Sequence, residues 1–449
     1  METKKKGFPV AFWVCACSEI FERLAYYLGR SLILIFVTAS VATGGLGLSD
    51  TVAANMQSNL TAFSYLLPLF GAVIVDKYIG ARYTTPVGMF IAAAGYFTGG
   101  IAKSATGVYV MIFLVSLGLA LFKNGAIIGR VITDKSQMDP AFSMRYTLVN
   151  VGAFIGTFLV GILYKDVFAK NGVLGFAPCF KMAALMMVLG GLWYIFVCWR
   201  FLGDLGKLPF KKTLTEEEKA AEAKKKEETG TKQPLTTIEK KRIGAIFVAS
   251  LFSIVFWIFW YLGYMPVYFY WAENMDWVVA GYQVPSTWFD AANSLFCVIL
   301  GPLTAALWKK LAARPQGDMS LFRKTGLGIA IIGVGYLFYA TIDIMRGGEK
   351  ASVLWLIVFA FLLTMGEMFF SPLGHSFISK YSPSRYLAVM MSVWGFATFI
   401  AAKSYGPVYG LLFGGKIEFK VACIGVAVVS FAAALIMIAL DKKLSALVD

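Results

Sequence analysis

A polar stretch near the amino terminus interrupts a segment that is otherwise apolar. Glu19, Glu22 and Arg23 lie within five residues of one another, in the middle of the apolar run 12–37. A charge at the centre of a membrane-spanning helix costs about 2.5–3.5 kcal/mol even on lenient scales, so three such charges are expected to be functional. The residues that share one helical stripe, at offsets of three or four, are Glu19, Glu22, Arg23, Tyr26, Tyr27 and Arg30. This stripe predicts a water-filled or substrate-filled cavity beside the helix.

The composition places this helix in a polytopic membrane protein. Hydrophobic residues make up 58% of the chain and charged residues only 15%, whereas a soluble domain has about 25% charged residues. A chain of 449 residues is long enough for about twelve spans of roughly 20–25 residues with short loops.

The formal net charge of +15 is explained by topology and does not indicate nucleic-acid binding. Basic residues gather in every second loop, as at Lys77 with Arg82 and at Lys309 with Lys310, while the alternate loops hold few cations. This alternation is the positive-inside pattern and predicts that both termini are cytoplasmic. The expected location is the cell inner (plasma) membrane.

Apolar runs and turn signals predict twelve spans. Their ranges are 8–40, 51–75, 83–102, 107–130, 143–165, 178–203, 241–270, 286–308, 323–346, 352–381, 387–411 and 418–441. The polar segment 204–240 separates six spans from six, which predicts an amino-terminal bundle at 1–203, a charged cytoplasmic linker at 204–240 and a carboxy-terminal bundle at 241–449. Within the linker, 216–228 has the composition of a solvated helix, with Thr215 and Glu218 as a capping box.

A second polar motif follows the second predicted span, where Gly-Ala-Val-Ile-Val-Asp-Lys-Tyr-Ile-Gly-Ala-Arg covers 71–82. Its glycines permit a tight turn and close helix approach, and its aspartate can cap a helix or meet a basic partner. The motif resembles the Gly-x-x-x-Asp-(Arg/Lys)-x-Gly-Arg-(Arg/Lys) loop of the major facilitator superfamily. With the six-plus-six plan, it implies an all-α integral membrane protein with twelve transmembrane helices in two six-helix bundles. The expected cytoplasmic gate-loop residues are Gly71, Asp76, Gly80 and Arg82.

Motifs in both halves resemble those of the proton-dependent oligopeptide transporter family. The family's Glu-x-x-Glu-Arg motif and the tyrosines after it match Glu19, Glu22, Arg23, Tyr26 and Tyr27, with a later arginine at Arg30. Further matches are Tyr65-Leu-Leu-Pro68, Leu121-Phe122-Lys123 followed by Asn124, Tyr146 with Asn150-x-Gly152, Phe256-Trp257, Asn293, Gly301-Pro302, Gly366-Glu367 with Ser371-Pro372-x-Gly374, and Met391-Ser-Val-Trp394.

The resemblance implies a proton-coupled symporter that imports di- and tripeptides by alternating access. A peptide zwitterion needs cations at one end, an anion at the other and an adaptable apolar pocket between them. By resemblance, Glu367 would take the peptide amine, and Arg23, Arg30 or Lys123 the carboxylate. The implied substrate-binding residues are Arg23, Tyr26, Tyr27, Arg30, Tyr65, Lys123, Tyr146, Asn150, Trp257, Asn293, Glu367, Phe370, Ser371 and Trp394.

Proton coupling is expected to use carboxylates, because the single histidine, His375, lies near the cytoplasmic end of its span. The expected coupling residues are Glu19, Glu22, Arg23, Lys123 and Glu367. Glu22 is the favoured proton shuttle with Arg23 as its counter-ion, and Glu19 is the next candidate. The alternative is a static buried ion network. Lys123 is expected to pair with Glu367 when substrate is absent, unless it extends to the membrane surface.

The seventh span departs from the family pattern. Members often have an acidic residue followed by glutamine after Phe-Trp, whereas this chain has Tyr261-Leu262, so the usual partner of Arg30 is missing. One hypothesis is that Asp290 replaces it by pairing with Arg30 or Lys403. The departure also favours an alternative function, a transporter of the same fold with another small charged or polar cargo. A receptor that does not transport is a third hypothesis.

This sequence does not contain the residue sets that other classes of protein require. There is no nucleophile–base–orienter set, no phosphate loop and no metal-ligand cluster, so an enzyme is not expected. No cofactor and no metal are expected, and the proton is the expected coupling ion. The expected partners are small peptides and the lipid bilayer, and the expected functional form is a monomer.

Overall fold

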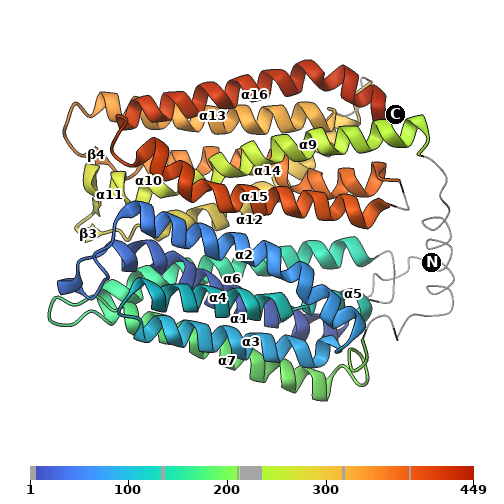
Figure 1. Ribbon diagram of the computed structural model, residues 1–449, viewed down its shortest axis with the longest axis horizontal. Helices are drawn as coiled ribbons and strands as arrows, with labels where there is room; N and C mark the ends of the chain where they lie inside the picture. The colour runs from blue at the N-terminus through green and yellow to red at the C-terminus, as the bar shows by residue number, and fades with distance from the viewer. Residues whose placement is uncertain are drawn as a thin grey trace. The chain divides into compact units, whose positions relative to one another are not determined.

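The computed structural model describes residues 7–132, 137–209, 212, 235–315, 319–383 and 386–448. Within these ranges, long helices dominate (Figure 1). The membrane-length stretches are α1 (Val10–Thr38), α2 (Asp50–Lys77), α3 (Ala81–Ile101), α4 (Ala105–Leu121) continued by α5 (Asn124–Val131), α6 (Met138–Ile162), α7 (Phe176–Arg200), α9 (Thr237–Leu262), α12 (Trp288–Ala312), α13 (Leu321–Met345), α14 (Trp355–Tyr381), α15 (Leu387–Phe413) and α16 (Phe419–Val448). They correspond one to one to the twelve predicted spans.

Eight of these stretches are long and apolar enough to cross a membrane by length and composition alone. α1 is not among the eight because Glu19, Glu22, Arg23 and Arg30 interrupt its apolar sequence. The charges that exclude α1 from these eight apolar stretches are the charges from which the sequence predicts a functional role.

The remaining described elements are short and connect the long helices. They are η1 (Val41–Thr43), η3 (Leu163–Val167), α10 (Met265–Tyr268), α11 (Tyr270–Asn274), β1 (Met275–Asp276), β2 (Val278–Val279), β3 (Tyr282–Gln283) and β4 (Ala351–Ser352). β1 pairs in parallel with β4, and β2 pairs antiparallel with β3. The predicted helix at 216–228 and its capping box lie outside the described residues. A capping box is formed at the start of α9 instead, where Thr236 Oγ1 accepts from the Glu239 backbone N–H at 3.2 Å.

The chain forms two compact units. Unit 1 comprises Met1–Leu48 and Leu66–Leu214, and unit 2 comprises Ser49–Tyr65 and Thr215–Asp449. The boundary therefore falls inside α2, whose first part belongs to unit 2.

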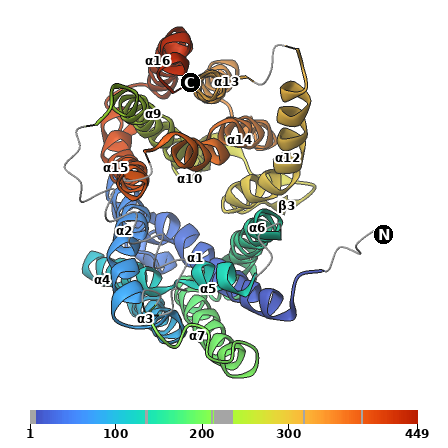
Figure 2. The ribbon, with the colours of Figure 1, turned by 90° about the vertical axis from the view of Figure 1, so that its right-hand side faces the viewer.

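Unit 1 is built around α1, which packs against α6 and α7, while α3 packs against α4 and α7 (Figure 2). Two glycines of α6 bring α6 close to α1. A Cβ at Gly152 would lie 2.9 Å from the Ile20 carbonyl oxygen, and a Cβ at Gly156 would lie 2.5 Å from that of Leu24. The absence of side chains at these positions allows the charged stripe of α1 to lie directly against α6.

Unit 2 pairs α13 with α16 and with α14, and pairs α9 with α15 and α12 with α14. α13 and α16 lie side by side in both views (Figures 1 and 2). The first part of α2 packs on α15, where Ser58 Oγ donates to the Ala402 carbonyl at 2.6 Å. A Cβ at Gly406 would lie 2.9 Å from the Ala54 carbonyl oxygen, so α2 and α15 also meet at a glycine.

Candidate functional site

The Glu22–Arg23 pair is the centre of the charged stripe on α1. Arg23 Nε and Nη2 donate to the two carboxylate oxygens of Glu22 at 2.5 and 2.6 Å, which is a bidentate pair. Glu22 is 0% exposed. In the part of the chain that the structure describes, the hydrogen bonds to the Glu22 carboxylate come from this one guanidinium.

Glu19 has different partners, although it lies one turn before Glu22. Its Oε1 accepts from Arg145 Nε of α6 at 2.8 Å and from Asn124 Nδ2 of α5 at 3.1 Å. Glu19 is 2% exposed. This carboxylate therefore joins three helices, whereas the Glu22–Arg23 pair is contained within one.

The tyrosines of the stripe lie beside its guanidinium groups. Arg23 Cζ is 4.9 Å from the Tyr26 ring centroid, and Arg30 Cζ is 5.9 Å from that of Tyr27. Such placements contribute cation–π stabilisation. The two rings meet edge to face at 5.3 Å. The predicted grouping on one face of α1 is thus present in the structure.

Lys123 lies at the break between α4 and α5, as the N-cap residue of α5. Its Nζ donates to the Pro68 carbonyl of α2 at 2.9 Å, and its backbone N–H donates to Thr85 Oγ1 at 3.3 Å. The ammonium is therefore held inside unit 1 by α2. Its predicted pairing with Glu367 stays a prediction.

Tyr146 and Asn150 lie one turn apart on α6. Asn150 Nδ2 donates to the Tyr146 carbonyl at 3.0 Å, and the Tyr146 residue is 49% exposed within the described structure. Both polar groups are accessible, as a substrate-binding role requires.

Glu367 on α14 is the buried acid of unit 2. Its Oε2 accepts from Asn293 Nδ2 at 3.3 Å, with Cys297 Sγ at 3.8 Å, and Asn293 also donates to Thr364 Oγ1 at 2.8 Å. Glu367 is 9% exposed. Among the described residues its donors are neutral, so the carboxylate is held in place without being neutralised by a cation.

Aromatic rings from α9, α14 and α15 form a wall one turn beyond Glu367. Phe370 stacks between Phe256 and Trp394, with centroid distances of 4.2 and 5.7 Å, and its edge meets Trp257 at 6.0 Å. The predicted residues Trp257, Phe370 and Trp394 are thus brought together. Ser371 follows in α14, but its side chain and that of His375 lie outside the described part.

The residues involved in the departure from the family pattern on the seventh span have hydrogen-bond partners within unit 2. Tyr261 OH donates to Tyr65 OH at 3.2 Å. Asp290 accepts from the Tyr268 hydroxyl, and Lys403 Nζ donates to Asn59 Oδ1. Lys403 therefore has Asn59 as one partner, and its pairing with Asp290 stays a prediction. The pairing of Asp290 with Arg30 stays a prediction.

The predicted gate loop packs on the segment that follows α7. A side chain at Gly80 would collide with the carbonyl oxygens of Gly206 and Lys207, and Arg82 donates through its backbone N–H to the Gly206 carbonyl at 3.1 Å. A side chain at Gly71 would collide with the Ala120 carbonyl oxygen of α4. Asp76 is half-buried near the end of α2. The glycines thus permit the close approach that the sequence predicts.

The same segment contains the exposed pair of Asp204 and Lys207. Lys207 Nζ donates to Asp204 Oδ1 at 2.6 Å. This hydrogen bond, and the positive charge behind it, lower the pKa of Asp204.

Arg145 is the main site residue that sequence reasoning missed. It is a cation inside the fifth predicted span, which is a signal for function. Its closeness to the start of that span made it resemble the basic residues of the neighbouring loop. Cys297 and Thr364, which complete the Glu367 site, carry no comparable signal.

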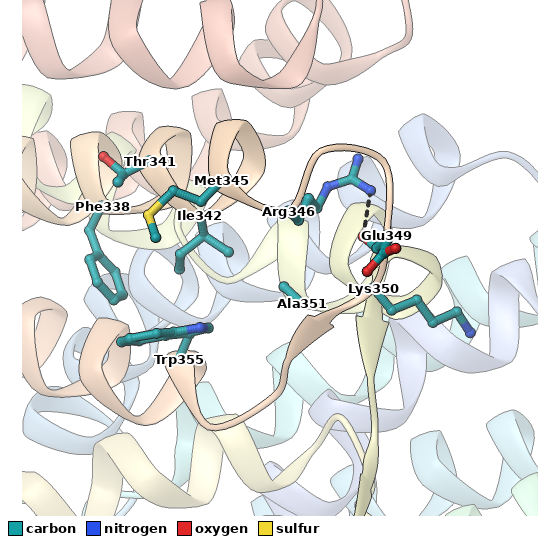
Figure 3. Close-up of a pocket in the computed structure, with 9 residues that line it drawn as sticks. All are labelled: Phe338, Thr341, Ile342, Met345, Arg346, Glu349, Lys350, Ala351 and Trp355. Carbon is teal, nitrogen blue, oxygen red and sulfur yellow. Dashed lines mark hydrogen bonds between the residues drawn. The ribbon is translucent and has the colours of Figure 1, made fainter.

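A separate cavity of about 270 Å³ lies between the end of α13 and the start of α14 (Figure 3). Phe338 and Trp355 face it on one side, and Arg346, Glu349 and Lys350 lie on the other. Arg346 Nη1 donates to the Glu349 carbonyl at 3.1 Å, and its Nε bonds Asp343 at 2.7 Å. Arg346 of this cavity is paired with an acid, and none of the predicted site residues lines the cavity.

A fold of twelve long helices with buried charges on α1 and α14 defines a multi-pass membrane transporter. The model of the POT family matches residues 203–413. The chain is 25% identical over 439 residues to the uncharacterized transporter YclF of Bacillus subtilis, covering 89% of this chain and 87% of that protein. It is 24% identical over 441 residues to the di-/tripeptide transporter of Lactococcus lactis subsp. cremoris, covering 86% of each.

A crystal structure of the peptide transporter POT in complex with sulfate superposes with a TM-score of 0.86 at 22% identity, covering 99% of this chain and 98% of that one. This likeness confirms the major facilitator fold, with twelve transmembrane helices in two six-helix bundles. These matches support the resemblance of the chain to the proton-dependent oligopeptide transporter family.

Proposed function

We propose that the protein is a proton-coupled symporter that imports di- and tripeptides by alternating access. Relatives over most of the chain's length are named di-/tripeptide transporters and dipeptide and tripeptide permeases. The proposed location is the cell inner (plasma) membrane with both termini cytoplasmic, and the proposed functional form is a monomer in the lipid bilayer. The proposed activity is transport and not enzymatic catalysis, and it uses the proton and no cofactor.

The buried bidentate Glu22–Arg23 pair is the observation that carries the proposal. A carboxylate in a membrane interior is stable as an anion only while a cation is paired with it. When a substrate carboxylate engages Arg23, Glu22 loses part of that stabilisation and binds a proton more readily. The substrate can then be bound at Arg23 while a proton is bound at Glu22. Symport requires that both are bound at the same time.

The charges of the two units suit the two ends of a peptide. Arg23, Arg30 and Lys123 of unit 1 supply cations for the carboxylate, and Glu367 of unit 2 supplies an anion for the amine. Because the described donors to Glu367 are neutral, none of them is a cation that would compete with a peptide ammonium group for this acid. The aromatic wall around Phe370 offers a tolerant apolar surface for side chains.

Uptake of labelled dialanine into proteoliposomes tests the proposal. Wild-type protein is expected to accumulate dialanine only with an inward proton gradient. Glu22→Gln is expected to abolish that accumulation and to keep passive counterflow, because it removes the protonatable group and leaves the substrate groups. Glu418→Gln, at an exposed pair with Lys420, is the matched control and should transport as the wild type does.

The Tyr261–Tyr65 contact supports a second candidate, the same transport mechanism with another small charged cargo. A neutral hydroxyl pair occupies the position where family members often place an acid, so the electrostatics near the substrate differ. Correctly inserted protein that takes up no dialanine, with or without a gradient, would favour this candidate.

A further inference from the structure

We propose that Arg145 is a positioning residue that ties the Glu19 carboxylate to α6, so that Glu19 joins helices and Glu22 alone carries the transported proton. This inference rests on the proposed proton-coupled transport. It divides the two carboxylates of α1 into one that joins helices and one that carries the proton.

The donors around Glu19 fit an anion. Arg145 Nε and Asn124 Nδ2 both point to the same oxygen, Oε1, at 2.8 and 3.1 Å. One donor is a guanidinium and the other is an amide on a different helix. A carboxylate that accepts from two such groups, with only 2% of its residue surface exposed, is held in place by one charge-assisted and one neutral hydrogen bond.

The backbone leaves space for the arginine. A Cβ built at Gly125 of α5 would lie 3.1 Å from Arg145 Cζ and 3.2 and 3.3 Å from its two terminal nitrogens. The guanidinium therefore lies directly against the glycine, in contact with α5 while it bonds to α1. Any side chain at 125 would press on this ion pair.

The same contacts fix the position of Lys123. Asn124 Nδ2 donates both to Glu19 and to the Cys15 carbonyl of α1, the latter at 2.8 Å. Asn124 is the first residue of α5 and directly follows Lys123, so these bonds set the break between α4 and α5. Arg145 acts on the substrate-binding lysine through Glu19 and Asn124, without touching the lysine itself.

Glu22 has a different environment. Its guanidinium partner belongs to the adjacent residue of the same helix and carries 26% exposed side-chain surface. Arg23 can turn to a substrate without disturbing the contacts between helices. If Arg145 left Glu19, by contrast, the junction of α1, α5 and α6 would lose its ion pair.

Further titratable groups lie near the two carboxylates on four helices. Those that interact electrostatically with Glu19 or Glu22 are Cys15 and Arg23 on α1, Tyr96 on α3, Arg145 on α6 and Tyr194 on α7, with Cys198 of α7 beside Cys15. The cations in this set are Arg23, which is hydrogen-bonded to Glu22, and Arg145, which is hydrogen-bonded to Glu19 and also acts electrostatically on Glu22. The pairing of two carboxylates with two guanidinium groups is therefore complete within this set.

The test is a double-mutant cycle on Glu19→Gln and Arg145→Gln, with thermal unfolding in detergent and dialanine uptake as the two readouts. Each single variant leaves one charge without its partner, buried in the case of Glu19 and partly exposed in the case of Arg145, and should lower the unfolding temperature. The double variant replaces the ion pair with two neutral amides and should recover most of the loss. Glu19→Gln keeps an oxygen that can accept from Asn124, which holds Lys123 in place, so the double variant should also keep gradient-driven accumulation and the wild-type pH profile. Adding Glu22→Gln should abolish accumulation but not counterflow.

Two results would overturn the inference. The first is a double variant that keeps counterflow but loses gradient-driven accumulation, since Glu19 would then carry the proton. The second is additive losses of unfolding temperature, which would mean that the pair is not coupled. Arg323→Gln with Asp441→Asn, at an ion pair of 2.7 Å in unit 2, is the matched control and should leave transport unchanged.

Gly125→Ala keeps the inference testable if the glutamine variants do not fold. This substitution retains both charges and presses a methyl group on the guanidinium. Gly125→Ala should lower the unfolding temperature of the wild type, and it should lower that of Arg145→Gln by less. Equal decreases in the two backgrounds would contradict the proposed contact. If the wild type accumulates no dialanine, the proposed function fails, but the thermal cycle still decides whether Arg145 positions Glu19.

Discussion

Tyr261 on α9 donates a hydrogen bond to Tyr65 on α2, with 3.2 Å between the two hydroxyl oxygens. The Tyr261 ring also stacks on Tyr405 of α15 at a centroid distance of 5.1 Å. A neutral contact of three aromatic side chains thus occupies the place where an acidic residue is frequent in the family. It links α9, α15 and the first part of α2 within unit 2.

Tyr261→Phe removes this hydroxyl and keeps the ring. The free energy of unfolding is expected to fall by about 1 kcal/mol, the usual net contribution of one hydrogen bond. Thermal unfolding in detergent measures it, with Tyr109→Phe, at a half-exposed position of α4, as the control. Tyr65→Phe completes a double-mutant cycle, and losses of the two single variants that add in full in the double variant would contradict the contact.

Glu367→Gln tests the amine site with little change of shape, because Asn293 can still donate to the amide oxygen. The affinity for dialanine should fall at least about tenfold, since a hydrogen bond to a charged group is worth about 1.5–3 kcal/mol. Competition against labelled dialanine measures this, with N-acetyl-dialanine as the comparison ligand. The ratio between the free and the acetylated peptide should shrink in the variant, and an unchanged ratio would exclude Glu367 as the amine ligand.

Gly156→Ala should weaken the packing of α6 on α1. The new methyl group would lie 2.5 Å from the Leu24 carbonyl oxygen, a backbone atom that cannot turn away. Overpacking of this kind costs about 1–3 kcal/mol, so the unfolding temperature should drop. Gly425→Ala on α16 is the matched helical control, because nothing lies within 4 Å of its Cβ, and it should be neutral or slightly stabilising.

Gly80→Ala addresses the gate loop. Its Cβ would collide with the carbonyl oxygens of Gly206 and Lys207, so the loop and the segment after α7 must separate. The expected result is faster proteolysis within 203–209 in detergent solution, with Gly7→Ala, where nothing lies within 4 Å, as the control. An unchanged cleavage rate in the variant would show that the two segments are not held together by this contact.

The charged stripe of α1 could be predicted because charges inside an apolar span are rare and costly. Its residues lie where the sequence places them, and the glycines at 71 and 80 make the close approaches that their motif suggests. The twelve spans follow from apolar runs that the membrane itself requires. These features depend on local sequence and on the bilayer.

The partners of the charges could not be predicted. Glu19 and Glu22 share a stripe, yet one bonds Arg145 of α6 and the other bonds its neighbour Arg23. The sequence does not predict the break at Lys123 inside the fourth span. This break depends on a hydrogen bond from Asn124 to a carbonyl of α1, which is distant in the sequence. Periodicity assigns a residue to a face of a helix, but the partner on that face comes from another part of the chain.

The boundary inside α2 has a consequence for how the chain can be divided. The segment Ser49–Tyr65 belongs to unit 2, and its contacts with α15 run through Ser58 and Gly406. A gene cut in the charged linker would therefore encode two fragments that are not the two units. The second fragment would lack one of its own helical segments, and it would need the first fragment present during synthesis to complete its fold.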